Sequence, residues 1–497
     1  MKPAASTDTM SALVRGGAMS LGGSLVSRAA GVAQSIVIAR GLDPHRLGVF
    51  AIVNYVLALG GALVDLGVPV AATKLVAEFR VTRPTALRRL LGILAGFSVL
   101  LATAGALLFL VGAEPLSRFY REPDLAPLFR LGAALLFTAL IGAVLSGAVQ
   151  GMRRIDTLAT VAAIKAVVAL GATLVLLPSL GLVGVIGASI VAEAVAWPLN
   201  GRPLRQALSV VPSTGDDGLS AGTVVKRALA LSVPVVLNGL VVWGGAWFVR
   251  SYLAREAGYD AVGYFHVADA CARLLLLLPL AVAVPFLPAL SESIALGREA
   301  ATQMVEGALR LTLFAVAPAG AFLSLAAEPV VRVVYGDAYA GSAAAVTSIL
   351  VLAATFQALG VMVWSTLVAA GLTWSGFAVQ AGGQVALVAL TVALVPGYGL
   401  GGVGVAAVAA ALATAGVGLA VVRAQLGVRL TTVRGALGVS GVGWLAAGAL
   451  WAIGATGWVP ATALAAVVVL LQFQRLARNE RSWILARVRW PGFAVQR

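Results

Sequence analysis

Residues 17–39 read GAMSLGGSLVSRAAGVAQSIVIA, and this stretch decides the class of fold. It is long enough to cross a bilayer core, which takes about 20 mostly apolar residues at helical rise. Arg28 stands near its centre. An arginine at that depth costs roughly 2.5–3.5 kcal/mol on insertion scales, so it persists only where a protein-lined or hydrated interior receives it. The stretch therefore predicts a transmembrane helix that carries a cation.

Small and polar residues share one face of this helix with Arg28. They follow one another at spacings of three and four, and they are Ser20, Ser24, Gly31 and Ser35. Such a face predicts a cation that lines a central cavity and receives an anion. The alternative is an arginine that pairs with a neighbouring carboxylate and only holds helices together. A functional role is favoured, because charges within membranes are functional by default.

The composition excludes a soluble globular protein. Of the 497 residues, 60% are hydrophobic and only 11% are charged, and the mean hydropathy is +0.98. The 57 glycines suit helices that approach one another closely through small residues. Long apolar runs such as 91–112 exceed the 9–11 residues of a membrane β-strand. The chain is therefore predicted to be an all-α polytopic membrane protein.

Cysteine and histidine are scarce. One cysteine, Cys271, allows no disulfide within the chain, and two histidines, His45 and His266, make a metal centre improbable. We therefore expect neither a metal nor a cofactor.

Apolar runs bounded by charges, glycines and prolines predict about fourteen transmembrane helices. They are expected near 12–39, 47–73, 86–112, 125–150, 155–177, 181–199, 226–250, 261–288, 303–326, 340–370, 374–395, 399–422, 432–453 and 457–474. With this count, 25 basic residues fall on the side of both termini and 8 on the other side. The positive-inside rule then predicts a multi-pass protein of the cytoplasmic (inner) membrane with cytoplasmic N- and C-termini. Because membrane orientation explains the net charge of +15, no nucleic-acid partner is expected.

An internal repeat divides the chain. The segment 114–118, EPLSR, recurs as 328–332, EPVVR, and the glycine-rich segment after Pro178 recurs after Pro396, at shifts of 214 and 218. The turn at 47–50 recurs at 262–265. Two six-helix lobes related by a pseudo-twofold axis along the membrane normal are therefore expected, with two extra C-terminal helices. The predicted parts are an N-lobe (1–200), a cytoplasmic linker (201–225), a C-lobe (226–425), helices 13 and 14 (426–474) and a basic interfacial tail (475–497).

Further charged and polar residues lie inside the predicted spans. His266, Asp269 and Arg273 share one helix face, and Asp269 precedes Arg273 by four residues. A structural ion pair and a site role are equally supported for these two. Asn54 and Asp65 lie on one stripe of the second helix, where a position near a bend is the simpler interpretation of Asp65.

Three other predicted spans carry isolated polar groups. Glu193 stands alone among apolar residues, so a proton-coupled carboxyl and a simply paired one are both open. In the seventh helix Asn238 follows Pro234, which would allow a bend. Three charged residues near predicted cytoplasmic helix ends are interpreted as snorkelling or surface pairs: Lys165, Glu306 and Arg310.

Several turns carry a family resemblance. Residues 41–76, GLDPHRLGVFAIVNYVLALGGALVDLGVPVAATKLV, contain a G-L-x-P-x-x-x-G turn and a later D-L-G break. They resemble the bacterial polysaccharide-export flippases of the Wzx or O-antigen/teichuronic transporter type, and residues 150–153 and 256–265 are also similar to that family. The resemblance covers essentially the whole chain. The larger group includes the multidrug/toxic-compound exporters and the lipid II flippase.

The resemblance implies a two-lobe transporter that moves polyprenyl-diphosphate-linked oligosaccharide to the outer leaflet by alternating access. It matches Arg28 and Arg273 with cavity arginines of the first and eighth helices. The expected substrate-binding residues of the cavity are Arg28, Ser24, Arg273, Asn54 and Asn238. The candidates for coupling or gating, with Na⁺ or H⁺ as the ion, are Asp65, Asp269, Glu193 and His266. Membrane lipids and other membrane proteins of polysaccharide assembly are further expected partners.

The alternatives are a lipid II flippase or a drug or metabolite exporter, and a membrane glycosyltransferase or polymerase is less favoured. An enzyme would need carboxylates or histidines gathered at a membrane face. Glu114 and Arg118 recur as Glu328 and Arg332, which favours a structural or gating pair at the outer mouth over a catalytic loop. We therefore expect no enzyme.

Overall fold

The computed structural model describes residues 7–209, 219–427, 431–474 and 476. All regular structure in these residues is helical, and none of them forms a strand. The prediction of an all-α polytopic protein is confirmed. Within the predicted linker, residues 210–218 lie outside the described part, as does the predicted interfacial tail apart from Leu476.

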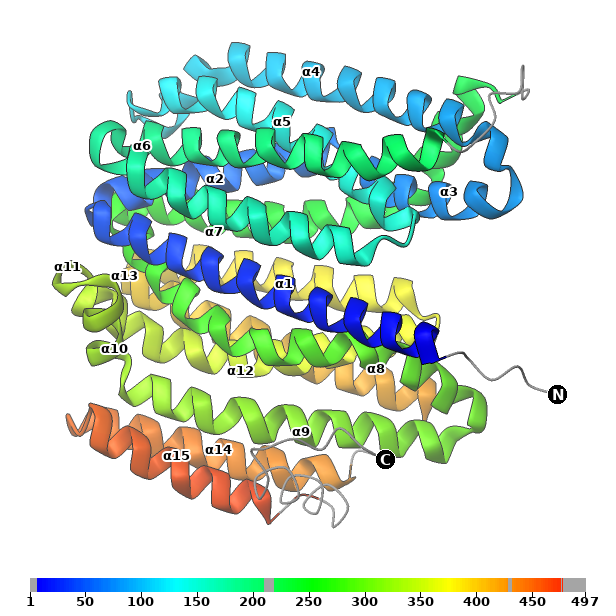
Figure 1. Cartoon of the computed structure of the whole chain (residues 1–497). Coiled ribbons are helices and arrows are strands. Elements are labelled where there is room, and N and C mark those ends of the chain that lie inside the picture. Colours follow the sequence, from blue (N-terminus) through cyan, green and yellow to red (C-terminus); the bar gives the residue numbers. More distant parts are fainter. Residues whose placement is uncertain (1–6, 210–218, 428–430, 475, 477–497) are drawn as a thin grey trace. The chain divides into compact units, whose positions relative to one another are not determined.

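The helices are long and are labelled in Figure 1. The first seven are α1 (Thr7–Gly41), α2 (Pro44–Val64), α3 (Val68–Thr82), α4 (Leu87–Tyr120), α5 (Leu125–Gly151), α6 (Ile155–Ser209) and α7 (Ala221–Arg273). The others are α8 (Leu277–Leu296), α9 (Arg298–Leu325), α10 (Ala327–Tyr335), α11 (Asp337–Ala340), α12 (Ser342–Ala369), α13 (Thr373–Leu426), α14 (Thr431–Ala452) and α15 (Trp458–Phe473). Two short 3₁₀ helices are η1 (Pro84–Ala86) and η2 (Leu274–Leu276).

The spans agree with the predicted number. Nine helical stretches of the described residues are long and apolar enough to cross a membrane. Three of them, 155–206, 236–283 and 373–426, are interrupted by a glycine with non-helical backbone angles. Dividing these three and adding α1 and the shorter apolar α15 gives the fourteen segments that the sequence predicts.

The second predicted helix, 47–73, is two helices. Leu66 has φ 45° and Gly67 has φ 70°, so the backbone turns left-handed between α2 and α3. The Asp65 carboxylate stabilises this turn, because its Oδ1 accepts a hydrogen bond from Gly67 N at 2.7 Å. Pro69 stands in the first turn of α3, where a missing N–H costs nothing. The interpretation of Asp65 as a residue at a bend is confirmed.

The two copies of the repeat share an unusual backbone. Gly181 in α6 has φ 55° and ψ −130°, and Gly399 in α13 has φ 53° and ψ −132°. A side chain larger than hydrogen disfavours these angles. The two glycines lie 218 residues apart, which is the shift found after Pro178 and Pro396. Each copy therefore folds the same helical hairpin about the same glycine.

Close packing inside the two hairpins is also repeated. A methyl group on Gly402 would meet the Leu394 carbonyl oxygen at 2.7 Å, and one on Gly184 would meet that of Leu176. These positions again differ by 218 residues. Glycine is therefore needed at both places, because the backbones of the two limbs touch.

The chain forms two compact units, Met1–Arg255 and Glu256–Arg497. In the first unit α1 packs against α6, and α5 packs against α3, α4 and α6. Its buried cluster joins α3, α4, α5, α6 and the start of α7, and includes Leu75, Leu90, Val149 and Ala228. The lobe boundaries predicted from the repeat, at 200 and 226, stay a prediction.

In the second unit α12 packs against α13, and α9 packs against α12, α14 and α15. The two C-terminal helices thus belong to this unit. Gln472 of α15 is buried and donates to Ala436 O at 2.9 Å and to Ser440 Oγ at 2.8 Å, both on α14. This amide fixes the pairing of the two helices inside an apolar environment.

Replacing Gly402 by alanine tests the hairpin packing. We expect Gly402→Ala to destabilise the protein by about 1–3 kcal/mol, because the new methyl overlaps a backbone carbonyl. The measurement is the apparent unfolding temperature in detergent micelles. Gly401→Ala is the matched control, since nothing lies within 4 Å of its added methyl. Equal unfolding temperatures for the two variants would refute the close contact.

Candidate functional site

Arg28 lies on the exposed side of α1. Ser24, Arg28 and Gly31 are all exposed, as the predicted polar face requires. Another side of α1 packs against α6, where Gln34 donates to Thr173 Oγ1 at 3.0 Å. Within the described residues Arg28 forms no hydrogen bond and no ion pair. Its five N–H donors are therefore available to a ligand.

The two asparagines of the predicted cavity differ in environment. Asn54 is exposed on α2 and has no hydrogen-bond partner in the described part of the chain. Asn238 is half-buried on α7, and its Oδ1 is buried without a partner among the same residues. A buried amide oxygen without a donor costs free energy, which a bound polar group would recover. Asn238 is therefore the better supported of the two candidates for binding a polar group of a ligand.

Arg250 of α7 is a buried cation that is not among the predicted site residues. It is 3% exposed, and its Cζ lies 3.6 Å from the centroid of the Tyr55 ring on α2. Close by, Trp247 Nε1 donates to Tyr120 Oη at 2.7 Å. The aromatic face compensates part of the cost of burying the guanidinium. No local spacing could have indicated this contact, because Tyr55 lies on a distant helix.

Asp65 lies at the break between α2 and α3, beside a cavity of about 10 Å³ that Ser98, Leu140 and Val144 also line. That volume is about enough for one water molecule. Asp65 also has no basic partner among the described residues. Asp65 and Ser98 are the polar residues of the cavity lining, and a carboxyl group next to so small a space has the chemistry to bind a proton or a small cation.

Glu193 does not stand alone. It is 8% exposed on the second limb of α6, and Lys165 on the first limb donates to its Oε1. Two further groups on its limb bond to α5: Trp197 Nε1 donates to Thr138 O at 3.0 Å, and Asn200 Nδ2 donates to Ser146 Oγ at 3.2 Å. The interpretation of Lys165 as a snorkelling residue is wrong, because the hairpin brings it to Glu193.

This ion pair belongs to one copy of the repeat. The residues 218 positions after Lys165 and Glu193 are Gly383 and Ala411. The same hairpin therefore forms about Gly399 without any charge at these places. Since a buried ion pair is weak evidence for stability, its presence in the first copy alone favours a role specific to that copy.

In the second unit Asp269 and Arg273 form the predicted pair. Arg273 Nε donates to Asp269 Oδ2 at 3.0 Å, and the Arg273 side chain remains 55% exposed. A guanidinium can pair with one carboxylate and still present other N–H groups to a second anion. His266, on the same helix, is half-buried. A structural ion pair and a role in ligand binding therefore both remain open for Asp269 and Arg273.

Glu306 and Arg310 on α9 are not surface residues, so that interpretation is wrong. Their side chains are 9% and 10% exposed, and Arg310 Nη1 lies 3.6 Å from Glu306 Oε2. The reason is that α9 is enclosed by α8, α12, α14 and α15.

The duplicated EPxxR segments behave differently in the two copies. Arg332 Nη2 donates to Glu328 Oε1 at 2.7 Å, four residues away, as predicted. Glu114 instead accepts from Arg130 Nη2 at 2.6 Å. The predicted pair of Glu114 with Arg118 therefore does not form. In addition, no three His, Cys, Asp or Glu side chains of the described residues gather as a metal site would require.

Solved transporters share this fold. A multidrug resistance MATE family transporter of the MOP superfamily, inward-facing, is 18% identical and covers 81% of this chain and 94% of its own, with a TM-score of 0.71. The lipid II flippase MurJ in an inward closed conformation is 14% identical and covers 94% of this chain and 98% of its own, also with a TM-score of 0.71. A MOP superfamily transporter from Pyrococcus furiosus is 19% identical, covers 84% and 95%, and has a TM-score of 0.59.

No curated protein sequence matches the chain. A family model described as "Polysaccharide biosynthesis protein" matches residues 37–344, which is more than half of the sequence. The resemblance that the turns at 41–48 and 65–67 suggest is thereby confirmed, and the chain belongs to the polysaccharide biosynthesis protein family.

Proposed function

We propose that the protein is a flippase that moves polyprenyl-diphosphate-linked oligosaccharide across the cytoplasmic membrane by alternating access. The family and the fold of the similar transporters support membrane transport in general. The observation that carries the finer proposal is Arg28, an exposed cation on a predicted membrane helix with no partner among the described residues. Both chain termini are proposed to lie in the cytoplasm.

The chemistry of arginine fits a diphosphate headgroup. A guanidinium donates two parallel hydrogen bonds to phosphate oxygens, and the low dielectric of a membrane protein strengthens them. Ser24 lies one turn away on the same exposed face and adds a hydroxyl. Arg273, with a side chain that is 55% exposed, is proposed as the second cation and Asn54 and Asn238 as partners of the sugar.

A lipid II flippase is the second candidate. The MurJ structure matches 94% of this chain, whereas the MATE family transporters match 81–84%. The larger coverage fits a chain whose α14 and α15 extend it beyond the two repeated copies. This favours a lipid-linked substrate over a drug. Because the similar structures are transporters or flippases, we propose transport without catalysis.

Asp65 is the proposed site of ion coupling. Among the three candidate carboxyls, Glu193 pairs with Lys165 and Asp269 pairs with Arg273. Asp65 alone has no basic partner within the described residues. A carboxyl group at a helix break can change its protonation or bind Na⁺ without leaving a cation uncompensated.

Replacing Arg28 tests the proposed function. We expect a deletion strain to accumulate complete polyprenyl-linked oligosaccharide, measured by mass spectrometry of lipid extracts. The wild-type gene should relieve this accumulation and Arg28→Ala should not, because losing a charge-assisted phosphate contact costs about 1.5–3 kcal/mol. Leu25→Ala, at an exposed neighbour on the same helix, should act as wild type. A truncated oligosaccharide would instead identify an assembly enzyme, and an unchanged pool would favour an exporter.

Two replacements of Asp65 distinguish a role in coupling transport to an ion from a role in the stability of the fold. The oxygen of asparagine can still accept the hydrogen bond from Gly67 N, so Asp65→Asn should keep the unfolding temperature. Asp65→Ala should lower stability by about 0.5–2 kcal/mol through loss of that bond. If Asp65 couples transport to an ion, Asp65→Asn loses the dependence of flipping on pH or Na⁺ in proteoliposomes. Unchanged dependence would remove Asp65 from the mechanism.

A matched pair of variants tests Lys165 and Glu193. Lys165→Met should destabilise the protein by about 1–3 kcal/mol, because Glu193 would stay buried without its cation, although Lys165 is partly solvated. The double variant Lys165→Met/Glu193→Gln should recover most of that stability. Thermal unfolding in micelles gives both values. Recovery of stability without recovery of flipping would show that the charges serve transport rather than folding.

A further inference from the structure

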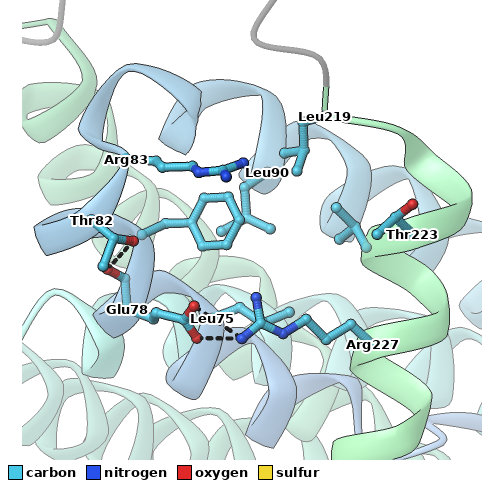
Figure 2. Close-up of a pocket in the computed structure, with 10 residues that line it drawn as sticks. Leu75, Glu78, Thr82, Arg83, Leu90, Leu219, Thr223 and Arg227 are labelled. Carbon is cyan, nitrogen blue, oxygen red and sulfur yellow. Dashed lines mark hydrogen bonds and ion pairs between the residues drawn. The ribbon is translucent and has the colours of Figure 1, made fainter.

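A hollow of about 330 Å³ opens where α3 ends and α4 and α7 begin. Half of its lining residues are apolar, and these include Leu75, Phe79, Leu90 and Leu219. Figure 2 shows this hollow, which lies wholly within the first unit. It also lies at one end of the apolar span Pro84–Tyr120, so it is placed at the depth of a lipid headgroup.

An ion pair closes one rim of the hollow. Arg227 Nη2 on α7 donates to both carboxylate oxygens of Glu78 on α3, at 2.9 and 2.8 Å (Figure 2). The hydroxyl of Thr82 donates to the Glu78 carbonyl oxygen at 3.0 Å. The Glu78 charge is thus compensated by Arg227 and does not oppose an anion in the hollow.

Arg83 supplies a cation that has no partner among the described residues. Its guanidinium extends over the hollow toward Leu90 and Leu219 (Figure 2). The side chain forms no hydrogen bond or ion pair with any described residue. A guanidinium above apolar walls offers a bidentate contact to a phosphate and an apolar surface to the carbon atoms attached to it.

The surrounding charge selects for an anion. Basic side chains near the lining residues in sequence include Lys74, Arg80, Arg88 and Lys226, and they outnumber the acidic ones, which are Glu78 in the lining and Asp216 and Asp217 beside it in sequence. The potential around the hollow is therefore positive. Positive potential also predicts the cytoplasmic side, where anionic lipids attract basic residues.

We propose that the hollow binds the phosphate ester of an anionic phospholipid of the cytoplasmic leaflet. Arg83 contacts the phosphate, and the apolar wall contacts the first carbons of the acyl chains. The site is separate from the Arg28 face of α1 and does not depend on the proposed substrate. A soluble phosphate ester carries the same anion, but it lacks the apolar part that Leu75, Leu90 and Leu219 would bury.

Native mass spectrometry of the full-length protein in neutral detergent tests the proposal, with short-chain phosphatidylglycerol as the probe. Arg83→Gln should weaken binding about tenfold, the size of one lost charge-assisted contact. Arg205→Gln is the matched control, since Arg205 is an exposed arginine of the same unit outside the hollow and should change binding less than about twofold. Equal effects of the two variants would overturn the site and leave only general surface charge.

Glu78→Gln gives a prediction of opposite sign. Freeing Arg227 from Glu78 adds a second guanidinium, so binding of phosphatidylglycerol should rise. Glu78→Gln/Arg227→Gln should abolish the rise, because the freed cation is gone.

Two competitors distinguish the source of the phosphate. Phosphatidylcholine and glycerol phosphate should each compete poorly, since the first lacks net charge and the second lacks acyl chains. Equal binding of phosphatidylcholine would refute anion recognition. Full displacement by glycerol phosphate at equal concentration would refute a lipid occupant in favour of a soluble phosphate ester.

Discussion

The cost of holding charge away from water organises the interior of this protein. An isolated charge in a low-dielectric environment is so unfavourable that it is paired, stacked on an aromatic ring or exposed to water. The described residues illustrate the first two solutions: Glu193 accepts from Lys165, Arg310 lies beside Glu306, and Arg250 stacks on Tyr55. Arg28 represents the third solution, because on its predicted membrane helix it is exposed and has no partner in the described part. That contrast makes it the strongest candidate for binding an anion.

Comparing the two copies of the repeat distinguishes the glycines that both copies need for folding from the charged residues that only the first copy carries. Both copies need glycine at 181 and 399, where the backbone adopts angles that side chains disfavour, and at 184 and 402, where two backbones touch. The charges are not duplicated in the same way. Lys165 and Glu193 correspond to Gly383 and Ala411, and the shift of 215 between the turns at 47–50 and 262–265 matches Arg28 with Trp243. The backbone is thus repeated at these glycines, whereas the charges at Lys165, Glu193 and Arg28 are not.

Local spacing could predict part of this arrangement. The helix positions, the breaks at Gly181 and Gly399 and the two i,i+4 pairs, Asp269 with Arg273 and Glu328 with Arg332, follow from hydrophobic runs, turn residues and helical geometry. The errors concern contacts between separate helices. Glu193 pairs with Lys165 across a helical hairpin, and Glu114 pairs with Arg130 on the next helix. Glu306 and Arg310 are buried by the helices that surround α9. Sequence spacing cannot reveal these contacts, because packing alone brings the helices together.

The start of α7 adds a constraint on motion. By sequence this helix opens the second copy of the repeat, yet its residues up to Arg255 belong to the first compact unit. Its polar contacts there include Arg227 with Glu78, Ser232 with Gly67 O at 2.8 Å, and Trp247 with Tyr120. The helix then continues into the second unit through Gly258, which has φ 84° and ψ 171°.

Under the proposed alternating access, these contacts limit the ways in which α7 can move. A motion that carries all of α7 with the second unit must break the three contacts, each worth about 0.5–1.5 kcal/mol. A motion about Gly258 keeps them, since glycine has the backbone freedom to change its angles. A ligand can shift an equilibrium between two states only by its difference in affinity for them. In such a mechanism, rotation at Gly258 costs less free energy than movement of the whole helix, because it keeps the three contacts.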